Sequence, residues 1–347
     1  MRGSSAFLDR IAGRRAAALL TDGRLEDFLI DPPEDGPAVP GAIFRGLVER
    51  PLKGMGGVFV RLPDGKGFLR HSKGLSAGQP VLVQISSHCE PGKAVPLTQK
   101  LLFKSKYAIV TPGAPGLNVS RAIRDEETRL QLRVLAAGIM EGSGFGLILR
   151  SASANAPEDK IAEDIAEMRA QAEAVTANAD GAAELLLDGP DAHALAWREW
   201  GSPDEVMTEP GCFAARGVLD DLASATAPLE DLSGGGTMAV EPTRAFVAVD
   251  VNTGADASPA AGLKANLAAA RALPRALRLR GLGGQIAIDF APLAKKDRRQ
   301  IEQALQAAFR SDAVETALAG WTPLGNFELQ RKRERTPLDA VVRKALR

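Results

Sequence analysis

The hydrophobic and polar positions divide the chain into a part made of short strands and a part in which strands alternate with helices. Residues 6–31 contain two apolar runs that flank Asp22-Gly23, a pair typical of tight turns, and this region ends at Pro32-Pro33. Between residues 41 and 103, five short apolar runs follow one another with Gly, Pro and Asp in the loops. Closely spaced strands without a helical period predict a small β-barrel of about five strands, of the OB type.

Two helices are predicted farther along, over residues 126–139 and 157–179, and a strand is expected between them. The first is amphipathic and the second is acidic, rich in alanine and typical of a surface helix. The apolar positions of the first are Leu130, Leu132, Val134 and Leu135, with a stop expected at Gly138; those of the second are Ile161, Ile165, Met168 and Ala172.

The last third of the chain contains two buried-looking runs, AFVAVDV at residues 245–251 and QIAIDF at residues 285–290. A segment with leucines at helical spacing and a glycine-rich turn lie between them. Strand, helix, turn and strand in this order predict a right-handed βαβ unit with parallel strands. The fold class expected is therefore α+β and multidomain, with an OB-type barrel inserted before an α/β region.

Composition excludes several protein classes. The chain has 347 residues, of which 45% are apolar and 25% charged, which excludes fibres and wholesale disorder. Cys89 and Cys212 are too few and too far apart for a disulfide scaffold or a cysteine-rich zinc site, and a reducing compartment fits them. The longest apolar run near the N-terminus, residues 16–20, is too short for a signal or a membrane span, so we expect a cytoplasmic protein without a membrane partner.

The net charge of zero hides strong segregation of charge along the chain. Residues 41–110 carry eleven Lys and Arg against three acidic side chains, whereas residues 141–232 carry nineteen acidic against five basic ones. Residues 331–347 hold seven basic and two acidic side chains. A basic module within a neutral chain indicates a nucleic-acid-binding surface, although solvated surface lysines are the alternative.

Three aromatic residues lie in strands of the basic module: Phe44, Phe59 and Phe68. Aromatic rings beside cationic side chains are suited to stacking unpaired bases. Packing in the barrel core is the alternative, and for a single phenylalanine it is the favoured one.

Each strand of the predicted βαβ unit has an aspartate near its carboxyl end, Asp250 and Asp289. These ends emerge at the same edge of a parallel sheet, so the two carboxylates could converge. Two carboxylates suit Mg²⁺ when water and a phosphate complete its coordination. Asn252, two residues after Asp250, could orient a water or the phosphate. Alternatively, each aspartate caps the helix or turn that follows its strand.

These segments resemble the catalytic segment of the ribonuclease E/G family. The family's Asp-x-Asn strand, Asn-Leu-x-Ala-Ala helix, Leu-Arg-Leu-Arg-x-Leu-Gly-Gly turn and Ile-Asp-Phe strand all occur here in order. The resemblance extends over nearly the whole chain, through KAVPLT, YAIVTP, NVSRAI and a strand that ends in Leu-Arg-Ser.

The resemblance implies four regions. Residues 1–39 would form an N-terminal hairpin belonging to a ribonuclease H-like subdomain completed by about residues 186–232. Residues 40–98 would form an S1 RNA-binding domain with the OB fold, and residues 99–185 a 5′-phosphate sensor-like region. Residues 233–347 would form the metal-binding catalytic subdomain, similar to DNase I.

The resemblance also implies roles for individual residues. Asp250 and Asp289 would hold Mg²⁺, with Mn²⁺ as a substitute, and Asn252 would assist them. Phe59, Phe68 and Lys93 would contact RNA. A 5′-monophosphate would bind Arg121, Arg150 and Ser151, where serine replaces the family's threonine but keeps the hydroxyl donor. Arginine suits this task because its guanidinium grips phosphate in a bidentate fork.

Three departures from the family pattern bear on activity. Where the family usually carries an arginine after the helix that follows the second aspartate strand, this chain reads SDAVET, with Glu315 nearest that place. The Cys-Pro-x-Cys segment through which two subunits share zinc is missing before Arg347, so no zinc is expected and any oligomer would form differently. Pro274 interrupts the predicted helix and should kink it.

The function expected from these features is a metal-dependent endoribonuclease that cleaves single-stranded RNA and is stimulated by a 5′-monophosphate. Its products would carry a 5′-phosphate and a 3′-hydroxyl, and its role would be RNA processing or decay. The alternative is a catalytically weak or inactive RNA-binding protein of the same family. A nicotinamide-dependent oxidoreductase is disfavoured because the GLGG turn precedes a strand and does not open a helix.

Overall fold

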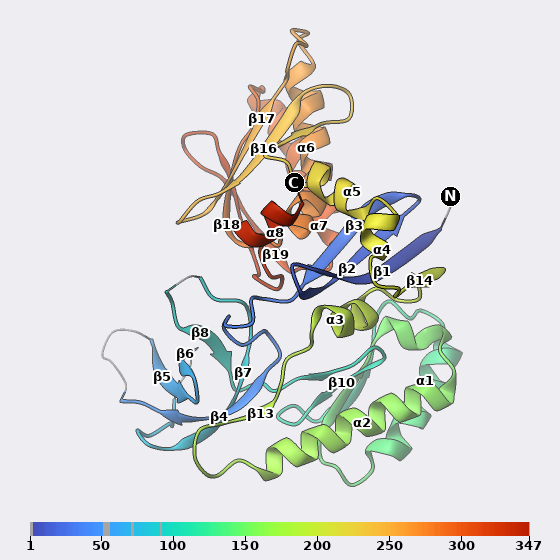
Figure 1. Cartoon of the computed structure of the whole chain (residues 1–347). Coiled ribbons are helices and arrows are strands. Elements are labelled where there is room, and N and C mark those ends of the chain that lie inside the picture. The colour runs from blue at the N-terminus through green and yellow to red at the C-terminus, as the bar shows by residue number, and fades with distance from the viewer. Residues whose placement is uncertain (1–2, 51–55, 71–72, 91, 347) are drawn as a thin grey trace. The chain divides into compact units, whose positions relative to one another are not determined.

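The computed structural model describes residues 3–50, 56–70, 73–90 and 92–346, as a mixed α+β protein (Figure 1). The chain divides into two compact units, one formed by residues 1–33 with 203–347 and the other by residues 34–202. Within the described residues, no helix has both the length and the apolar character needed to cross a membrane.

The predicted barrel is confirmed in the second unit. Its five strands form a closed sheet because β4 pairs with both β5 and β7. Gly67 is required in this barrel, since a Cβ atom there would lie 2.3 Å from the Leu97 side chain. The strands are β4 (Ile43–Val48), β5 (Gly57–Leu62), β6 (Gly65–Arg70), β7 (Pro80–Ile85) and β8 (Val95–Thr98).

The rest of the second unit is a four-stranded sheet, in the order β11-β12-β10-β9, with two helices packed against it. Its strands are β9 (Phe103–Lys104), β10 (Ala108–Thr111), β11 (Gly116–Val119) and β12 (Gly146–Leu149). The other elements of this unit are α1 (Glu126–Met140), the 3₁₀ helix η1 (Ser151–Asn155), α2 (Glu158–Ala177), β13 (Glu184–Leu187) and α3 (Ala192–Glu199).

Helix α1 differs in detail from the prediction. It continues through Gly138 to Met140, so this glycine is not a stop. Leu130 and Val134 are 63% and 67% exposed, whereas Leu132 is buried against the sheet. Helical spacing alone could not tell which leucines face the core, because the apolar positions cover more than one side of this helix. In α2, by contrast, all four predicted apolar positions are buried.

The first unit begins with three strands where two were predicted. Ala12 and Gly13 adopt positive φ angles of 49° and 81° and form a second tight turn before the one at Asp22-Gly23. The sheet has the order β14-β1-β2-β3. Its strands are β1 (Ser4–Ile11), β2 (Arg14–Thr21), β3 (Arg24–Ile30) and β14 (Glu205–Met207), and the short helices α4 (Cys212–Ala215), α5 (Val218–Ala225) and α8 (Ala340–Ala345) complete its core.

A six-stranded sheet in the order β15-β16-β17-β18-β20-β19 forms the rest of the first unit. Strands β17 and β18 are parallel and are joined by α6, so the predicted strand-helix-strand topology is present. The elements are β15 (Leu229–Asp231), β16 (Thr237–Pro242), β17 (Val247–Asn252), α6 (Ala261–Arg280), β18 (Gly284–Asp289), the 3₁₀ helix η2 (Lys295–Asp297), α7 (Arg298–Arg310), β19 (Thr316–Trp321) and β20 (Phe327–Arg331).

One face of this sheet is buried and the other is open. Val247, Val249 and Val251 alternate with exposed or partly exposed positions along β17, and β18 and β20 repeat this pattern. The buried face forms a core with α6 and α7. Helix α6 is continuous from Ala261 to Arg280, so Pro274 does not interrupt it.

The arginines at the end of α6 tie this sheet to the N-terminal strands. Arg275 donates a hydrogen bond of 2.6 Å to the Leu25 carbonyl, and Arg278 donates one of 3.0 Å to the Glu26 carbonyl. Arg278 also forms an ion pair with Asp312. The first arginine of the Leu-Arg-Leu-Arg segment therefore holds the fold together.

Candidate active site

The structure brings Asp250 and Asp289 together at one edge of the six-stranded sheet. They are register partners on the parallel strands β17 and β18, so both side chains point to the same face. Both residues are exposed, on the face of the sheet opposite the core that contains Val249 and Ile288. Directly paired side chains on adjacent strands have their Cβ atoms about 5 Å apart, within reach of one shared cation.

Asn252 lies on the same face, two residues beyond Asp250, and donates a hydrogen bond of 2.6 Å from its Nδ2 to the Asp250 Oδ2. The sequence placed these residues near one another, and the local geometry links them directly. Its amide oxygen remains available for a further contact, because the hydrogen bond uses only the amide nitrogen.

Neither aspartate acts as the helix cap considered as an alternative. The N-cap of α6 is Ala260, and the N-cap of η2 is Ala294. Across the described parts of the chain, no lysine or arginine forms an ion pair with Asp250 or Asp289. Like charges placed directly opposite each other on adjacent strands destabilise a sheet. Among the described residues this pair has no basic partner to offset its repulsion, although the Asn252 amide donates a hydrogen bond to Asp250.

The chemistry of this edge fits a divalent cation with few protein ligands. No cluster of three or more His, Cys, Asp or Glu side chains suited to a metal occurs among the residues described. Two carboxylates are sufficient protein ligands for Mg²⁺, because this ion usually keeps several waters and takes further oxygens from a phosphate. The arrangement suits a cation that is held jointly by protein and substrate.

Glu315, the acidic replacement for a family arginine, lies at the other end of the sheet. It directly precedes β19, whose first residue Thr316 pairs with Arg331, and Arg331 pairs with Gly284 at the start of β18. The strand from Gly284 to Asp289 spans about 16 Å at the usual rise per residue. Glu315 therefore lies away from the aspartates along the strands, and its effect on activity stays a prediction.

The structure separates the three aromatic residues of the barrel. Phe44 is 5% exposed and belongs to the core. Phe59 and Phe68 are partly exposed on the outer side of β5 and β6, where their ring centroids lie 5.4 Å apart in an edge-to-face arrangement. Gly57 makes room for this pair, since a Cβ atom there would lie 2.7 Å from the Phe68 ring. Core packing, favoured for each ring singly, holds only for Phe44.

Basic side chains flank the two outer rings. Arg61 and Lys66 are register partners two residues along the strands from Phe59 and Phe68, and all four lie on the same outer face. Lys66 forms an ion pair of 2.8 Å with Glu49. Lys93 is exposed in a turn before β8 and pairs with Glu90. This face has the rings and cations suited to single-stranded nucleic acid.

The residues expected to bind a 5′-phosphate gather at the carboxyl ends of two parallel strands. Val119 and Leu149 are register partners at the ends of β11 and β12. The Ser120 amide donates a hydrogen bond of 2.9 Å to the Leu149 carbonyl, so Arg121 follows one strand where Arg150 follows the other. Ser151 is exposed at the start of η1. The sequence motifs are brought to one edge of this sheet.

The Arg150 guanidinium is already engaged. It donates hydrogen bonds of 2.6 Å to both the Ser105 carbonyl and Glu199 Oε2, where Glu199 is the last residue of α3. Burial works to raise the pKa of Glu199, but Arg198 and Arg150 outweigh it and hold this pKa below its ordinary value. Glu199 thus occupies Arg150 as an anion, which the sequence motifs did not reveal because 49 residues separate the pair.

Sequence reasoning also missed the turn between β19 and β20. Ile288 and Phe327 are register partners, so the turn that precedes Phe327 lies at the same edge as Asp289. Glu328 is exposed on the open face of the sheet, opposite Ala287. The alternation of apolar and polar residues in FELQR was the only sequence signal for β20. Such alternation predicts a strand but not which strand it pairs with.

Comparisons with known proteins agree with these features. The model of the ribonuclease E/G family matches residues 103–206 and 204–334. Ribonuclease E of Synechocystis sp. is 28% identical over 92% of this chain and 56% of the relative, and ribonuclease E of Nostoc sp. is 27% identical over 92% and 54%. Ribonuclease G of Escherichia coli is 26% identical over 94% of this chain and 79% of the relative.

The chain spans about half the length of the two ribonuclease E relatives. The family match nevertheless covers most of both compact units, including the two aspartate strands and the Arg150 edge. This protein belongs to the ribonuclease E/G family.

Proposed function

We propose that this protein is a metal-dependent endoribonuclease that cleaves single-stranded RNA in RNA processing or decay. The observation that carries the proposal is the pair formed by Asp250 and Asp289, two exposed carboxylates in direct register that no cation offsets within the described residues. A repulsive pair retained at the carboxyl edge of parallel strands is suited to binding a divalent cation. Family membership supports RNA as the substrate.

In this proposal, Asp250 and Asp289 hold Mg²⁺ or Mn²⁺ through one carboxylate each. When bound, such a cation acidifies a coordinated water and stabilises the charge that develops on a phosphodiester. Asn252 fixes the orientation of Asp250 through its hydrogen bond, and its amide oxygen can accept a hydrogen bond from the attacking water. The products carry a 5′-phosphate and a 3′-hydroxyl.

Residues 40–98 act in this proposal as the S1 module that holds the RNA strand. Phe59 and Phe68 provide partly exposed rings on which unpaired bases stack. Arg61 and Lys66 lie beside the rings and contact the phosphates, as does Lys93 from its turn. Because these contacts are electrostatic, RNA affinity should fall steeply with added salt.

A 5′-monophosphate on the RNA binds Arg121, Arg150 and Ser151 and stimulates cleavage. Since Glu199 already pairs with Arg150, the phosphate must replace a carboxylate. A phosphate offers more charge and three acceptor oxygens, so the exchange favours the monophosphorylated end over a 5′-hydroxyl end, which cannot displace Glu199.

The test compares Mg²⁺-dependent cleavage of single-stranded oligonucleotides that carry a 5′-monophosphate or a 5′-hydroxyl. We expect cleavage of both, faster for the monophosphate, and complete inhibition by EDTA. The readout is the position and end chemistry of the fragments. Binding without cleavage at any Mg²⁺ or Mn²⁺ concentration would instead identify the protein as an RNA-binding member of the family.

A further inference from the structure

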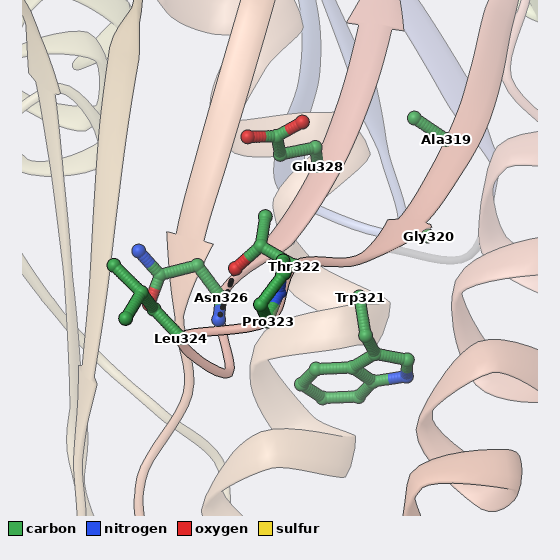
Figure 2. A pocket seen from close by; sticks show the side chains of 8 residues that line it. All are labelled: Ala319, Gly320, Trp321, Thr322, Pro323, Leu324, Asn326 and Glu328. Carbon is green, nitrogen blue, oxygen red and sulfur yellow. Dashed lines mark hydrogen bonds between the residues drawn. The ribbon is translucent and has the colours of Figure 1, made fainter.

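An open hollow of about 580 Å³ lies at the turn between β19 and β20 (Figure 2). In Figure 2 the side chains of Leu324, Asn326 and Glu328 extend to one side of the hairpin, whereas the indole ring of Trp321 points another way. The hollow is lined by Ala319, Gly320, Trp321, Thr322, Pro323, Leu324, Asn326 and Glu328.

This hollow adjoins the aspartate edge. Ile288 pairs with Phe327, and continuing this antiparallel register one step sets Asp289 opposite Asn326. Neighbouring strands lie about 4.8 Å apart, so the backbone at Asn326, just before β20, is expected close to the Asp289 end of β18. An RNA strand whose phosphodiester sits at Asp250 and Asp289 would place an adjoining nucleotide over the hairpin.

The hairpin is held firmly in place. The Trp321 Nε1 donates a hydrogen bond of 2.7 Å to Glu302, and the Arg298 guanidinium lies 4.5 Å from the centre of the indole ring. Across the turn, the Thr322 amide donates to the Asn326 carbonyl at 2.7 Å, and the Asn326 amide donates to Thr322 Oγ1 at 3.1 Å. A turn anchored at both ends loses little freedom when a ligand binds.

The lining chemistry suits a nucleobase and not a phosphate. Leu324 is 94% exposed, the largest exposed fraction among the exposed large hydrophobic residues, and offers apolar contact to the face of a base. Glu328 is exposed and, within the described residues, pairs with no cation, so it repels phosphate and accepts hydrogen bonds from an amine. Asn326 adds an amide that can both donate and accept. Carboxylates and amides in this role read the exocyclic amines of bases.

We propose that this hollow is a nucleobase subsite that reads the base next to the cleaved phosphodiester. It favours bases with an exocyclic amine over uracil, which lacks this donor and offers Glu328 only its N3–H between two carbonyl oxygens. Glu328 sets this preference, and Leu324 contributes affinity for any base. The inference rests on the proposed ribonuclease function and adds a source of sequence preference to it.

The test maps cleavage sites in oligonucleotides randomised around the scissile position, for the wild type and two variants. We expect Glu328→Gln to reduce the preference for amine-bearing bases over uracil about fivefold to tenfold, because a carboxylate acceptor is lost. Leu324→Ala should raise KM about threefold to fivefold for every sequence. Matched controls are Glu241→Gln, on the same face at β16, and Leu130→Ala, an exposed leucine on α1; both should match the wild type.

A second measurement does not depend on cleavage. In EDTA, the Asp289→Asn protein is titrated with an oligonucleotide, and a photo-crosslinking amino acid at position 324 reports which nucleotide it contacts. Crosslinking to one nucleotide supports the subsite if it weakens when uracil replaces cytosine at that nucleotide alone. In Glu328→Gln, the same replacement should weaken the crosslink less. Wild-type cleavage with an unchanged cleavage pattern in both variants and no crosslink would overturn the subsite alone. Absence of cleavage by the wild type, with the crosslink present, would overturn only the proposed nuclease function.

Discussion

The two ends of the six-stranded sheet carry charge in opposite ways. At the start of β18, the Asp312 side chain is fully buried between Arg278 and Arg331, and Arg331 is 1% exposed. At the carboxyl ends of β18 and the adjacent β17, Asp289 and Asp250 face solvent side by side, and no cation pairs with either among the residues that the structure describes. A buried charge must be paired because its desolvation is costly. A solvated pair of like charges is tolerated at a smaller cost, and a bound cation would remove that cost.

The edge formed by β11 and β12 lies between these extremes. Arg150 is partly buried and bound to Glu199, with the two side chains 24% and 27% exposed. An ion pair with this degree of exposure can exchange partners, since water and ions reach it. The three edges therefore differ in how their charges are paired. Asp312 is buried between two arginines, Arg150 and Glu199 form a partly exposed pair, and Asp250 and Asp289 have no basic partner among the described residues.

The largest effect is expected at the end of the sheet where Asp312 is buried between two arginines. Asp312→Ala removes the only carboxylate that pairs with Arg331 in the described residues, so a buried guanidinium is left unpaired. We expect a loss of about 3–5 kcal/mol in the free energy of unfolding, measured by urea denaturation. Asp231→Ala, at an exposed carboxylate of the same sheet, is the control and should change stability by less than about 0.5 kcal/mol. Equal effects of the two variants would remove the distinction between the ends.

The next effect tests the aspartate edge. Mg²⁺ at a hundred times its dissociation constant should raise wild-type stability by about 2.7 kcal/mol, and Asp289→Asn should abolish this increment. In EDTA the same variant should be more stable than the wild type by up to about 1 kcal/mol, because the repulsion with Asp250 is relieved. Thermal unfolding with and without Mg²⁺ measures both. A variant that loses stability in EDTA would contradict the repulsive pair.

A smaller effect is expected for the exchangeable pair. Glu199→Gln should cost about 1 kcal/mol at pH 7, because a charge-assisted hydrogen bond to Arg150 is weakened. The pKa of Glu199 is lowered in the folded protein, so the stabilisation is present above its ordinary pKa of 4.5 and is lost as the pH falls through the lowered value. The stability difference between the two proteins should therefore shrink as the pH falls below the ordinary pKa of 4.5 in urea titrations.

The same variant tests whether a 5′-phosphate competes with Glu199 for Arg150. Glu199→Gln frees Arg150 from an anionic competitor, so affinity for 5′-monophosphorylated RNA should rise relative to 5′-hydroxyl RNA. The control is Glu163→Gln, which removes an exposed ion pair with Lys160 on α2. Unchanged discrimination between the two RNA ends in Glu199→Gln would show that phosphate does not compete for Arg150.

The smallest effect concerns Glu315. Because this residue lies about 16 Å along the strands from Asp289, Glu315→Arg should alter the cleavage rate of 5′-hydroxyl RNA less than about twofold. Its effect on stability should stay within about 0.5 kcal/mol, as for other exposed positions. A large gain in cleavage would mean that the two ends of the sheet act on the same phosphodiester.

Alternation and spacing in the sequence were sufficient to predict the barrel, helix α2 and the strand-helix-strand segment, because each has a hydrophobic period that matches one burial pattern. The aspartates were predicted to meet because parallel strands end at a common edge. The same local reasoning did not resolve the first turn of the chain, where Ala12-Gly13 carries no strong signal, or the exposed leucines of α1.

Contacts between distant segments were decided by the tertiary structure alone. Strand pairing shows that Glu315 lies away from Asp289 and that the β19–β20 turn is at the aspartate end of the sheet. The packing of α3 shows that Glu199 pairs with Arg150. The physical reason is that side-chain periodicity specifies which face of an element is buried, whereas strand register and the ends of helices specify which charges meet. Amino-acid order therefore determined the elements and the candidate ligands, and tertiary packing determined which of their charges are paired.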